Sequence, residues 1–196
     1  MVLRYMLLES EAAFYCGNVT CALEYLHARN IAYRDLKPEN LFITRRGQKN
    51  DFVKVLDFGI AKATGPQLTD RTLFTSQGML IGTPAYMSPE QAEMSGIDID
   101  TRSDIYSLGV ILYELLSGEP PFLPKSLVEA GYGEIQRIIR EEEPKRPSTR
   151  ATTIEEASNV AEARRLNLST LRKHLSGAVS YTHLRAHETL RYLVCR

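Results

Sequence analysis

The feature that most constrains the fold of this chain is a short polar loop at residues 33–40, YRDLKPEN. Apolar residues at helical spacing precede the loop and predict a helix over residues 10–29. Two short apolar runs, 41–43 and 53–56, follow the loop, and the polar turn at 45–51 between them predicts a β-hairpin. The loop is therefore expected to join a helix to a hairpin.

The rest of the chain is a long loop followed by helical patterns. Residues 57–90 are rich in Thr, Ser, Gly and Pro, and they far exceed an ordinary connection of about 4–6 residues, which indicates a functional loop. Residues 102–117 predict a buried apolar helix that ends at Gly118 and the two prolines after it. Weaker patterns predict helices at about 126–142 and within 154–175, with Pro144 and Pro147 as breakers between them.

Composition excludes several classes of function. The 24 basic and 24 acidic side chains cancel, so charge favours neither nucleic-acid nor membrane binding. The longest apolar run, near 108–116, is shorter than the about 20 residues that span a bilayer, and the first residues lack a signal-peptide layout. The three cysteines have no zinc or disulfide spacing and indicate free thiols in a reducing cytoplasm. We expect a cytoplasmic protein, although a longer parent could carry a membrane anchor elsewhere.

The polar loop resembles the catalytic loop of protein kinases, in which an Asp is followed five residues later by an Asn. This resemblance implies that Asp35 orients the substrate hydroxyl as a base and that Lys37, followed by Pro as in the serine/threonine class, contacts the transferring phosphoryl group. Asn40 would then bind magnesium, and Phe42 would lie near the adenine of ATP. The alternative for this segment is an ordinary polar turn, because Asp, Asn and Pro all favour turns.

A second motif, Asp57-Phe58-Gly59, comes 17 residues after Asn40. By the same resemblance, Asp57 supplies a carboxylate to Mg²⁺ (or Mn²⁺), a hard cation that prefers oxygen ligands. Phe58 is expected to set active or inactive geometry by its packing, and Gly59 to let the backbone swing. Tyr33 stands where the family usually has His, and both are large rings that can pack under Phe58.

Two further motifs follow in the family's order. Residues 82–90, GTPAYMSPE, resemble the end of the activation segment, with Ser88 in place of the usual Ala. Thr83 would brace the catalytic Asp and Lys, and Glu90 would pair with an Arg near the end of the lobe; Arg146 lies too close in sequence to fit that role. Asp104, in DIYSLG, would accept backbone N–H groups of the catalytic loop, the alternative being a simple helix N-cap.

Arg34 has a regulatory meaning in the family, where this residue often pairs with a phosphorylated side chain of the activation loop. The candidate phosphorylation sites are Thr69, Thr72, Thr75 and Ser76. A solvated polar loop without phosphorylation is the alternative.

Together the four motifs make residues 5–145 similar to serine/threonine protein kinases of the bacterial, eukaryotic-like type. The resemblance implies an α+β fold, the mostly helical C-terminal lobe of a kinase with a small β-hairpin. The N-terminal lobe is expected to be absent, since no Gly-rich loop occurs and Lys37 is the first lysine. We expect residues 1–178 to be a partial kinase domain, truncated at both ends, that is inactive by itself.

The parent protein is expected to use ATP to phosphorylate Ser or Thr on protein substrates in signal transduction.

Residues 179–196 resemble a translated sequencing adapter, the alternative being a genuine amphipathic helix. Residues 11–40 look more like the kinase branch that contains the cyclic-nucleotide-dependent enzymes, which suggests a chimeric origin. The alternatives to the kinase are a non-catalytic, pseudokinase-like docking module and a spurious chimeric reading frame. The substrate protein and the oligomeric state stay open.

Overall fold

The computed structural model describes residues 9–46, 49–56, 62–63, 84–93, 100–123, 131–153, 161, 164 and 166–176. In chain order its elements are α1 (Glu9–His27), β1 (Ile31–Ala32), the 3₁₀ helix η1 (Pro38–Asn40), β2 (Leu41–Arg46), β3 (Lys49–Val55), β4 (Lys62–Ala63), the 3₁₀ helix η2 (Pro84–Tyr86), α2 (Pro89–Glu93), α3 (Arg102–Ser117), α5 (Tyr132–Glu141), α6 (Pro147–Thr153) and α8 (Leu168–Leu175). The expected class, α+β and mostly helical, is confirmed.

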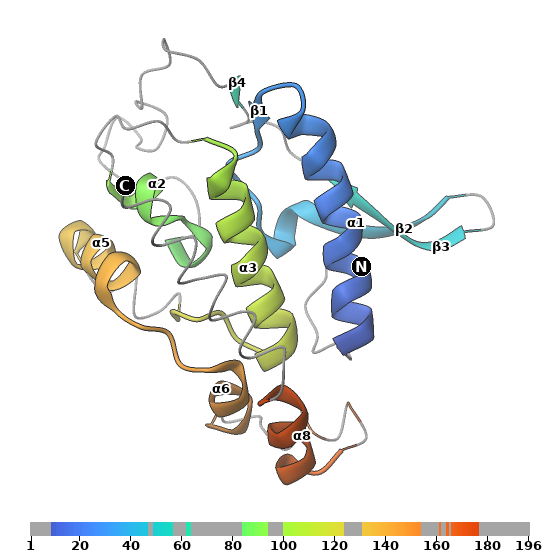
Figure 1. Cartoon of the computed structure of the whole chain (residues 1–196), viewed down its shortest axis with the longest axis vertical. Helices are drawn as coiled ribbons and strands as arrows, with labels where there is room; N and C mark the ends of the chain where they lie inside the picture. Colours follow the sequence, from blue (N-terminus) through green and yellow to red (C-terminus); the bar gives the residue numbers. More distant parts are fainter. Residues whose placement is uncertain are drawn as a thin grey trace.

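Helices α1 and α3 lie side by side at the centre of the molecule (Figure 1). Val19 and Leu23 lie one turn apart on α1, and both are buried in the same core as Val110 and Ile111 of α3. The apolar pattern of 102–117 therefore predicted α3 correctly. The helix expected at 10–29 is also confirmed, and it ends at His27.

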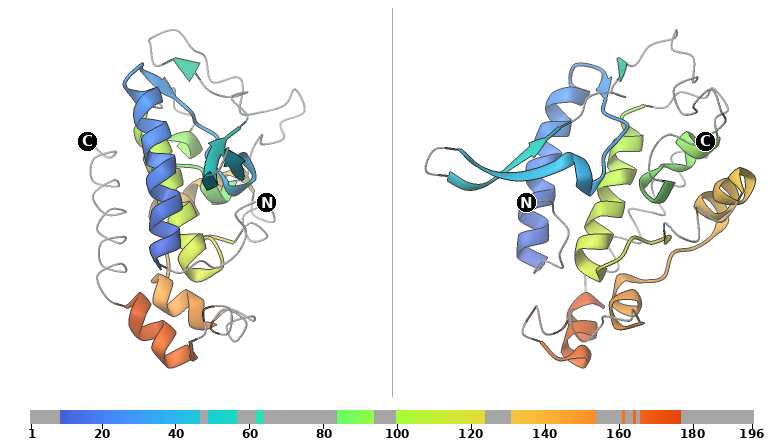
Figure 2. Two further views of the ribbon diagram at one scale, coloured as in Figure 1. Left: turned by 90° about the vertical axis from the view of Figure 1, so that its right-hand side faces the viewer. Right: turned by 180° about the vertical axis from the view of Figure 1, so that it is seen from behind.

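The predicted hairpin is formed by β2 and β3, which pair antiparallel with Leu41 opposite Val55 and Phe42 opposite Lys54. It projects from the helical body (Figure 2). The expected polar turn at 45–51 was too long, because pairing continues to Arg46 opposite Lys49 through a register shift after Thr44. Polar side chains are tolerated there because the projecting end is open to solvent: Thr44 and Arg45 are exposed.

In the second half of the chain shorter helices follow: α5 packs against α2, α6 against α3, and α8 against α6. Helix α5 occupies the later part of the expected 126–142 helix and buries Ile135 and Ile139, while residues 124–130 lie outside the described part. Helix α6 was missed because Pro147 was interpreted as a breaker. Pro147 is instead the first residue of α6, where the missing N–H costs nothing. Helix α8 lies within the predicted 154–175 stretch.

Two free thiols lie on α1. Burial raises the pKa of the Cys16 thiol to about 12, so this group stays protonated and weakly nucleophilic at neutral pH. Cys21 is exposed. Among the helices that the structure describes, none is long and apolar enough to cross a membrane.

Replacing either of two glycines by alanine should change the free energy of unfolding, in opposite directions. Gly118 ends α3 at φ 91°, and its N–H donates to the Glu114 carbonyl at 2.7 Å. Gly118→Ala should lower the free energy of unfolding by about 1 kcal/mol, because an L-residue is strained in that conformation. Gly17→Ala, inside α1, should raise it by about 0.5–1 kcal/mol, since an added Cβ meets nothing within 4 Å. Urea unfolding followed by circular dichroism measures both, and a shared sign would contradict this account.

Candidate active site

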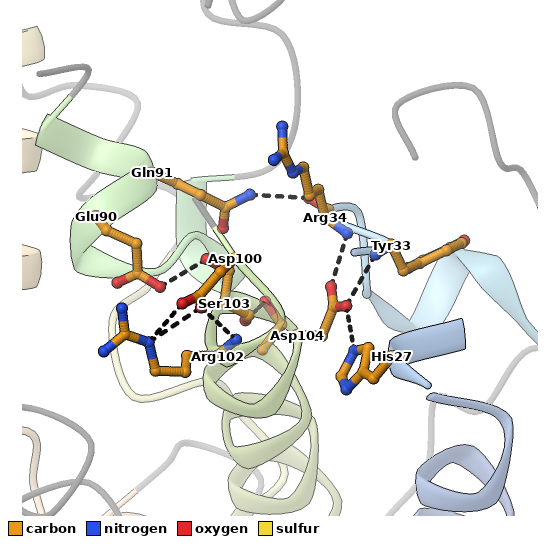
Figure 3. Close-up of polar contacts among 10 residues, drawn as sticks. His27, Tyr33, Arg34, Glu90, Gln91, Asp100, Arg102, Ser103 and Asp104 are labelled. Carbon is orange, nitrogen blue, oxygen red and sulfur yellow. Dashed lines mark hydrogen bonds and ion pairs between the residues drawn. The ribbon is translucent and has the colours of Figure 1, made fainter. Parts of the chain in front are cut away.

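One buried carboxylate holds the polar loop of residues 33–40. Asp104, in the first turn of α3, has no exposed surface. Its Oδ2 accepts the N–H of Tyr33 at 2.8 Å, and its Oδ1 accepts the N–H of Arg34 at 2.7 Å (Figure 3). The helix starts at Arg102 with Thr101 at the cap position, so Asp104 bonds to the loop rather than capping α3. Two charge-assisted hydrogen bonds thereby set the path of the backbone just before Asp35.

His27 is a third partner of the same carboxylate and was not singled out from the sequence. Its Nε2 lies 2.8 Å from Oδ2 of Asp104. An ionised carboxylate only accepts, so Nε2 of His27 is the protonated, donating nitrogen. Asp104, at the start of α3, is therefore the point where the end of α1 and the loop of residues 33–40 meet.

The backbone at Arg34 takes an unusual conformation. Its φ of 67° lies in the left-handed region, which costs a residue with a side chain about 1–3 kcal/mol. The preceding Tyr33 is completely buried, whereas the Asp35 side chain, which follows, keeps 12% of its surface exposed. Such strained residues persist only where the surrounding structure holds them.

Three of the predicted site residues come together directly after this turn. The Nζ of Lys37 lies 2.9 Å from Oδ1 and 2.8 Å from Oδ2 of Asp35. The Nδ2 of Asn40 donates to the Asp35 backbone carbonyl at 2.8 Å and to its Oδ2 at 2.9 Å. The 3₁₀ helix η1, with Pro38 as its first residue, brings Asn40 back toward Asp35. The ammonium group of Lys37 and the amide of Asn40 thus both contact the Asp35 carboxylate, at a site that is partly shielded from solvent.

The hairpin is tied to the same loop through Leu56, the residue before Asp57. The Leu56 N–H donates to the Asn40 carbonyl at 2.9 Å, and the Tyr33 hydroxyl donates to the Leu56 carbonyl. Phe42, the residue expected near adenine, is half-buried on β2. Tyr33 and Asn40 therefore fix the backbone of Leu56, the residue that precedes Asp57.

The segment of residues 84–93 lies against α3. Glu90 is buried, and its Oε1 accepts the Ser103 hydroxyl at 2.6 Å (Figure 3). Its Oε2 has no hydrogen-bond partner within the part of the chain that the structure describes. Arg146 is exposed. The next residue, Gln91, was not singled out from the sequence, yet its Nε2 donates to the Arg34 carbonyl at 2.9 Å.

The remaining predicted residues lie outside the described part of the chain. They are Asp57, Phe58, Gly59, Thr83 and the candidate phosphorylation sites Thr69, Thr72, Thr75 and Ser76. Their roles stay predictions.

Comparison with known proteins identifies the class. Residues 2–189 match the protein kinase domain family, so the chain belongs to that family. It is 46% identical over 134 residues to the serine/threonine-protein kinase pkn3 of Myxococcus xanthus, which covers 68% of this chain and 23% of that protein. It is 45% identical over 132 residues to the serine/threonine-protein kinase PknB of Mycolicibacterium smegmatis, covering 66% of this chain and 18% of that protein.

A eukaryotic relative is also similar. The cAMP-dependent protein kinase, catalytic subunit-like, of Caenorhabditis elegans is 41% identical over 120 residues, covering 61% of this chain and 26% of that protein. The bacterial relatives confirm the expected resemblance to bacterial serine/threonine kinases. The matched segment spans 26% or less of these three relatives' own length.

Proposed function

We propose that this chain supplies the hydroxyl- and metal-binding part of a kinase active site that transfers phosphoryl from ATP to Ser or Thr of protein substrates. The observation that carries the proposal is the contact of Asp35 with both Lys37 and Asn40 at 2.8–2.9 Å. Phosphoryl transfer depends mainly on positioning and charge stabilisation, and this cluster offers both.

In this proposal Asp35 orients the hydroxyl of the substrate and accepts its proton. Lys37 places a positive charge beside that carboxylate, next to where the transferring phosphoryl group would lie. The two side chains keep only 12% and 19% of their surface exposed. Shielding from water strengthens the electrostatic effect of Lys37 on developing negative charge.

The donor atoms fit a hard divalent cation. Both hydrogen bonds of Asn40 to Asp35 use Nδ2, which leaves the amide oxygen Oδ1 as the ligand atom. Asp57 would add a carboxylate directly after the anchored Leu56. Mg²⁺ or Mn²⁺ held by these oxygens would neutralise charge on the ATP phosphates when bound.

A phosphotransfer assay tests the proposal. The 196-residue chain is compared with a protein in which the N-terminal lobe of the Mycolicibacterium relative precedes residues 1–178, each with labelled ATP, Mg²⁺ and a Ser/Thr peptide. We expect transfer by the joined protein, and none by the chain alone, because the chain has no Gly-rich loop and no lysine before Lys37. A folded, ATP-binding joined protein without transfer would support a non-catalytic docking module instead.

The cellular setting follows from the same chemistry. The proposed location is the cytoplasm, where ATP is available and thiols such as Cys16 and Cys21 stay reduced. Fractionation of cells that express the tagged chain would test this location.

A further inference from the structure

The residue before the proposed catalytic Asp35 is held at both of its backbone groups. The Arg34 N–H donates to Asp104 at 2.7 Å, and the Arg34 carbonyl accepts Nε2 of Gln91 at 2.9 Å (Figure 3). Arg34 is also the residue at φ 67°. The two partners come from different elements, since Asp104 lies on α3 and Gln91 on α2. Side chains from two different helices thus hold the strained backbone at Arg34.

The Gln91 side chain is itself oriented by its neighbour. Its Oε1 accepts the Ser88 N–H at 3.0 Å and the Ser88 hydroxyl at 3.1 Å. Gln91 keeps only 4% of its surface exposed, and Ser88 none. An amide has one accepting and one donating end, so commitment of Oε1 to Ser88 directs Nε2 to Arg34. Ser88, the departure from the usual Ala, therefore has a defined contact.

We propose that Gln91, oriented by Ser88, is a positioning residue for Asp35. The Arg34 carbonyl and the Asp35 N–H belong to one planar peptide group, so a bond to that oxygen sets the plane from which Asp35 leaves. Gln91 is the second residue after Pro89 in α2, directly behind the activation segment. It links the end of that segment to the catalytic loop through a single side chain. The inference rests on the proposed function of Asp35.

The chain offers a matched control. Gln136 on α5 also donates its Nε2 to a backbone carbonyl, that of Ala92, at 2.6 Å. Gln136→Met removes the same kind of hydrogen bond from the same neighbourhood without touching Arg34. Gln91→Met and Gln136→Met therefore differ in whether the lost bond leads to the catalytic loop.

The first measurement is amide hydrogen exchange in the 196-residue chain, followed by NMR or by mass spectrometry of peptides that cover residues 28–41. We expect Gln91→Met to speed exchange at Arg34 and Asp35 by about tenfold, since local opening becomes easier. Gln136→Met should leave these rates unchanged. Unchanged rates in Gln91→Met, or equal increases in both variants, would overturn the proposal.

If Gln91→Met does not fold, Gln91→Glu takes its place in the same measurement. This variant keeps an oxygen acceptor for Ser88 and loses the amide donor toward Arg34. The same two outcomes then decide the proposal.

The second measurement separates positioning from general packing in the joined protein described above. Gln91→Met should lower kcat by about tenfold or more at unchanged KM for ATP and peptide, because a small displacement of Asp35 slows transfer without weakening binding. Gln136→Met should keep both constants. If Gln91→Met speeds exchange at Arg34 and Asp35 but the wild-type joined protein shows no transfer, the positioning contact is supported and the proposed function is rejected.

Discussion

Replacing Asp104 by asparagine should lower the free energy of unfolding by about 3 kcal/mol. Among the described residues the carboxylate has three partners, and all are donors: the N–H groups of Tyr33 and Arg34, and Nε2 of His27. Asparagine has nearly the same shape but turns one acceptor into an NH₂ group. At least one buried donor then faces another donor, and the charge that strengthens the other bonds is lost. Urea unfolding of the 196-residue chain measures the loss.

Asp100→Asn is the control for this experiment. Asp100 also accepts a backbone N–H, that of Arg102, at 2.8 Å, and it pairs with the guanidinium of Arg102. Its side chain is 34% exposed, so water can replace the lost contacts. We expect a loss of at most about 1 kcal/mol. Equal losses in the two variants would show that the burial of Asp104 and its three donors do not stabilise the loop as described.

Replacing Asp35 by asparagine should lower kcat of the joined protein by about 10³-fold, the range expected for removal of a proton acceptor that also orients the nucleophile. The amide keeps an oxygen that can accept from Lys37 or Asn40, so the loop contacts are partly retained. The KM for ATP should change little, because Asp35 is proposed to act on the hydroxyl. Initial rates at varied ATP and peptide concentrations separate the two constants.

Asp51→Asn provides the comparison. Asp51 is exposed on β3, and its Oδ1 accepts the Tyr15 hydroxyl at a long 3.4 Å. This variant makes the same chemical change at an exposed position outside the loop of residues 33–40 and should leave kcat within about twofold of wild type. Substantial activity in Asp35→Asn would remove this residue from the reaction and favour another base.

Local pattern was enough where the interacting residues are close in sequence. The apolar spacing of 102–117 predicted α3, and the paired apolar runs predicted the hairpin. Asp35, Lys37 and Asn40 lie within six consecutive positions, so one tight turn and η1 bring them into contact. Interactions of such short range depend little on the rest of the fold, and the catalytic roles that the family resemblance implies for these residues stay predictions.

Pro147 shows where local pattern misled. A proline can end a helix or begin one, and the sequence around it does not say which. The structure places it at the start of α6, where Ser148 and Ala151 are buried. Packing of α6 against α3 and α8 decides the matter, and this packing is a tertiary property.

Gln91 and His27 show a different limit. Gln91 reaches Arg34 across 57 positions in the sequence, and His27 reaches Asp104 across 77. A glutamine after a Ser-Pro-Glu motif and a histidine at the end of a helix have no local pattern that marks them as functional. Gln91 faces a backbone carbonyl and His27 faces a carboxylate because of how the fold packs their helices.

The sequence alone therefore determined the family, the helices with strong apolar periodicity and which residues form the polar loop. Each of these depends on residues that are neighbours along the chain. The resemblance had also implied that Asp104 accepts backbone N–H groups of this loop, whereas the contacts of His27 and Gln91 came only from the tertiary structure. Packing of α1, α2 and α3 brings Asp104 and Gln91 onto the backbone of Arg34 and places His27 against the Asp104 carboxylate. Buried backbone donors and acceptors need partners, and which side chains supply them depends on how distant elements pack.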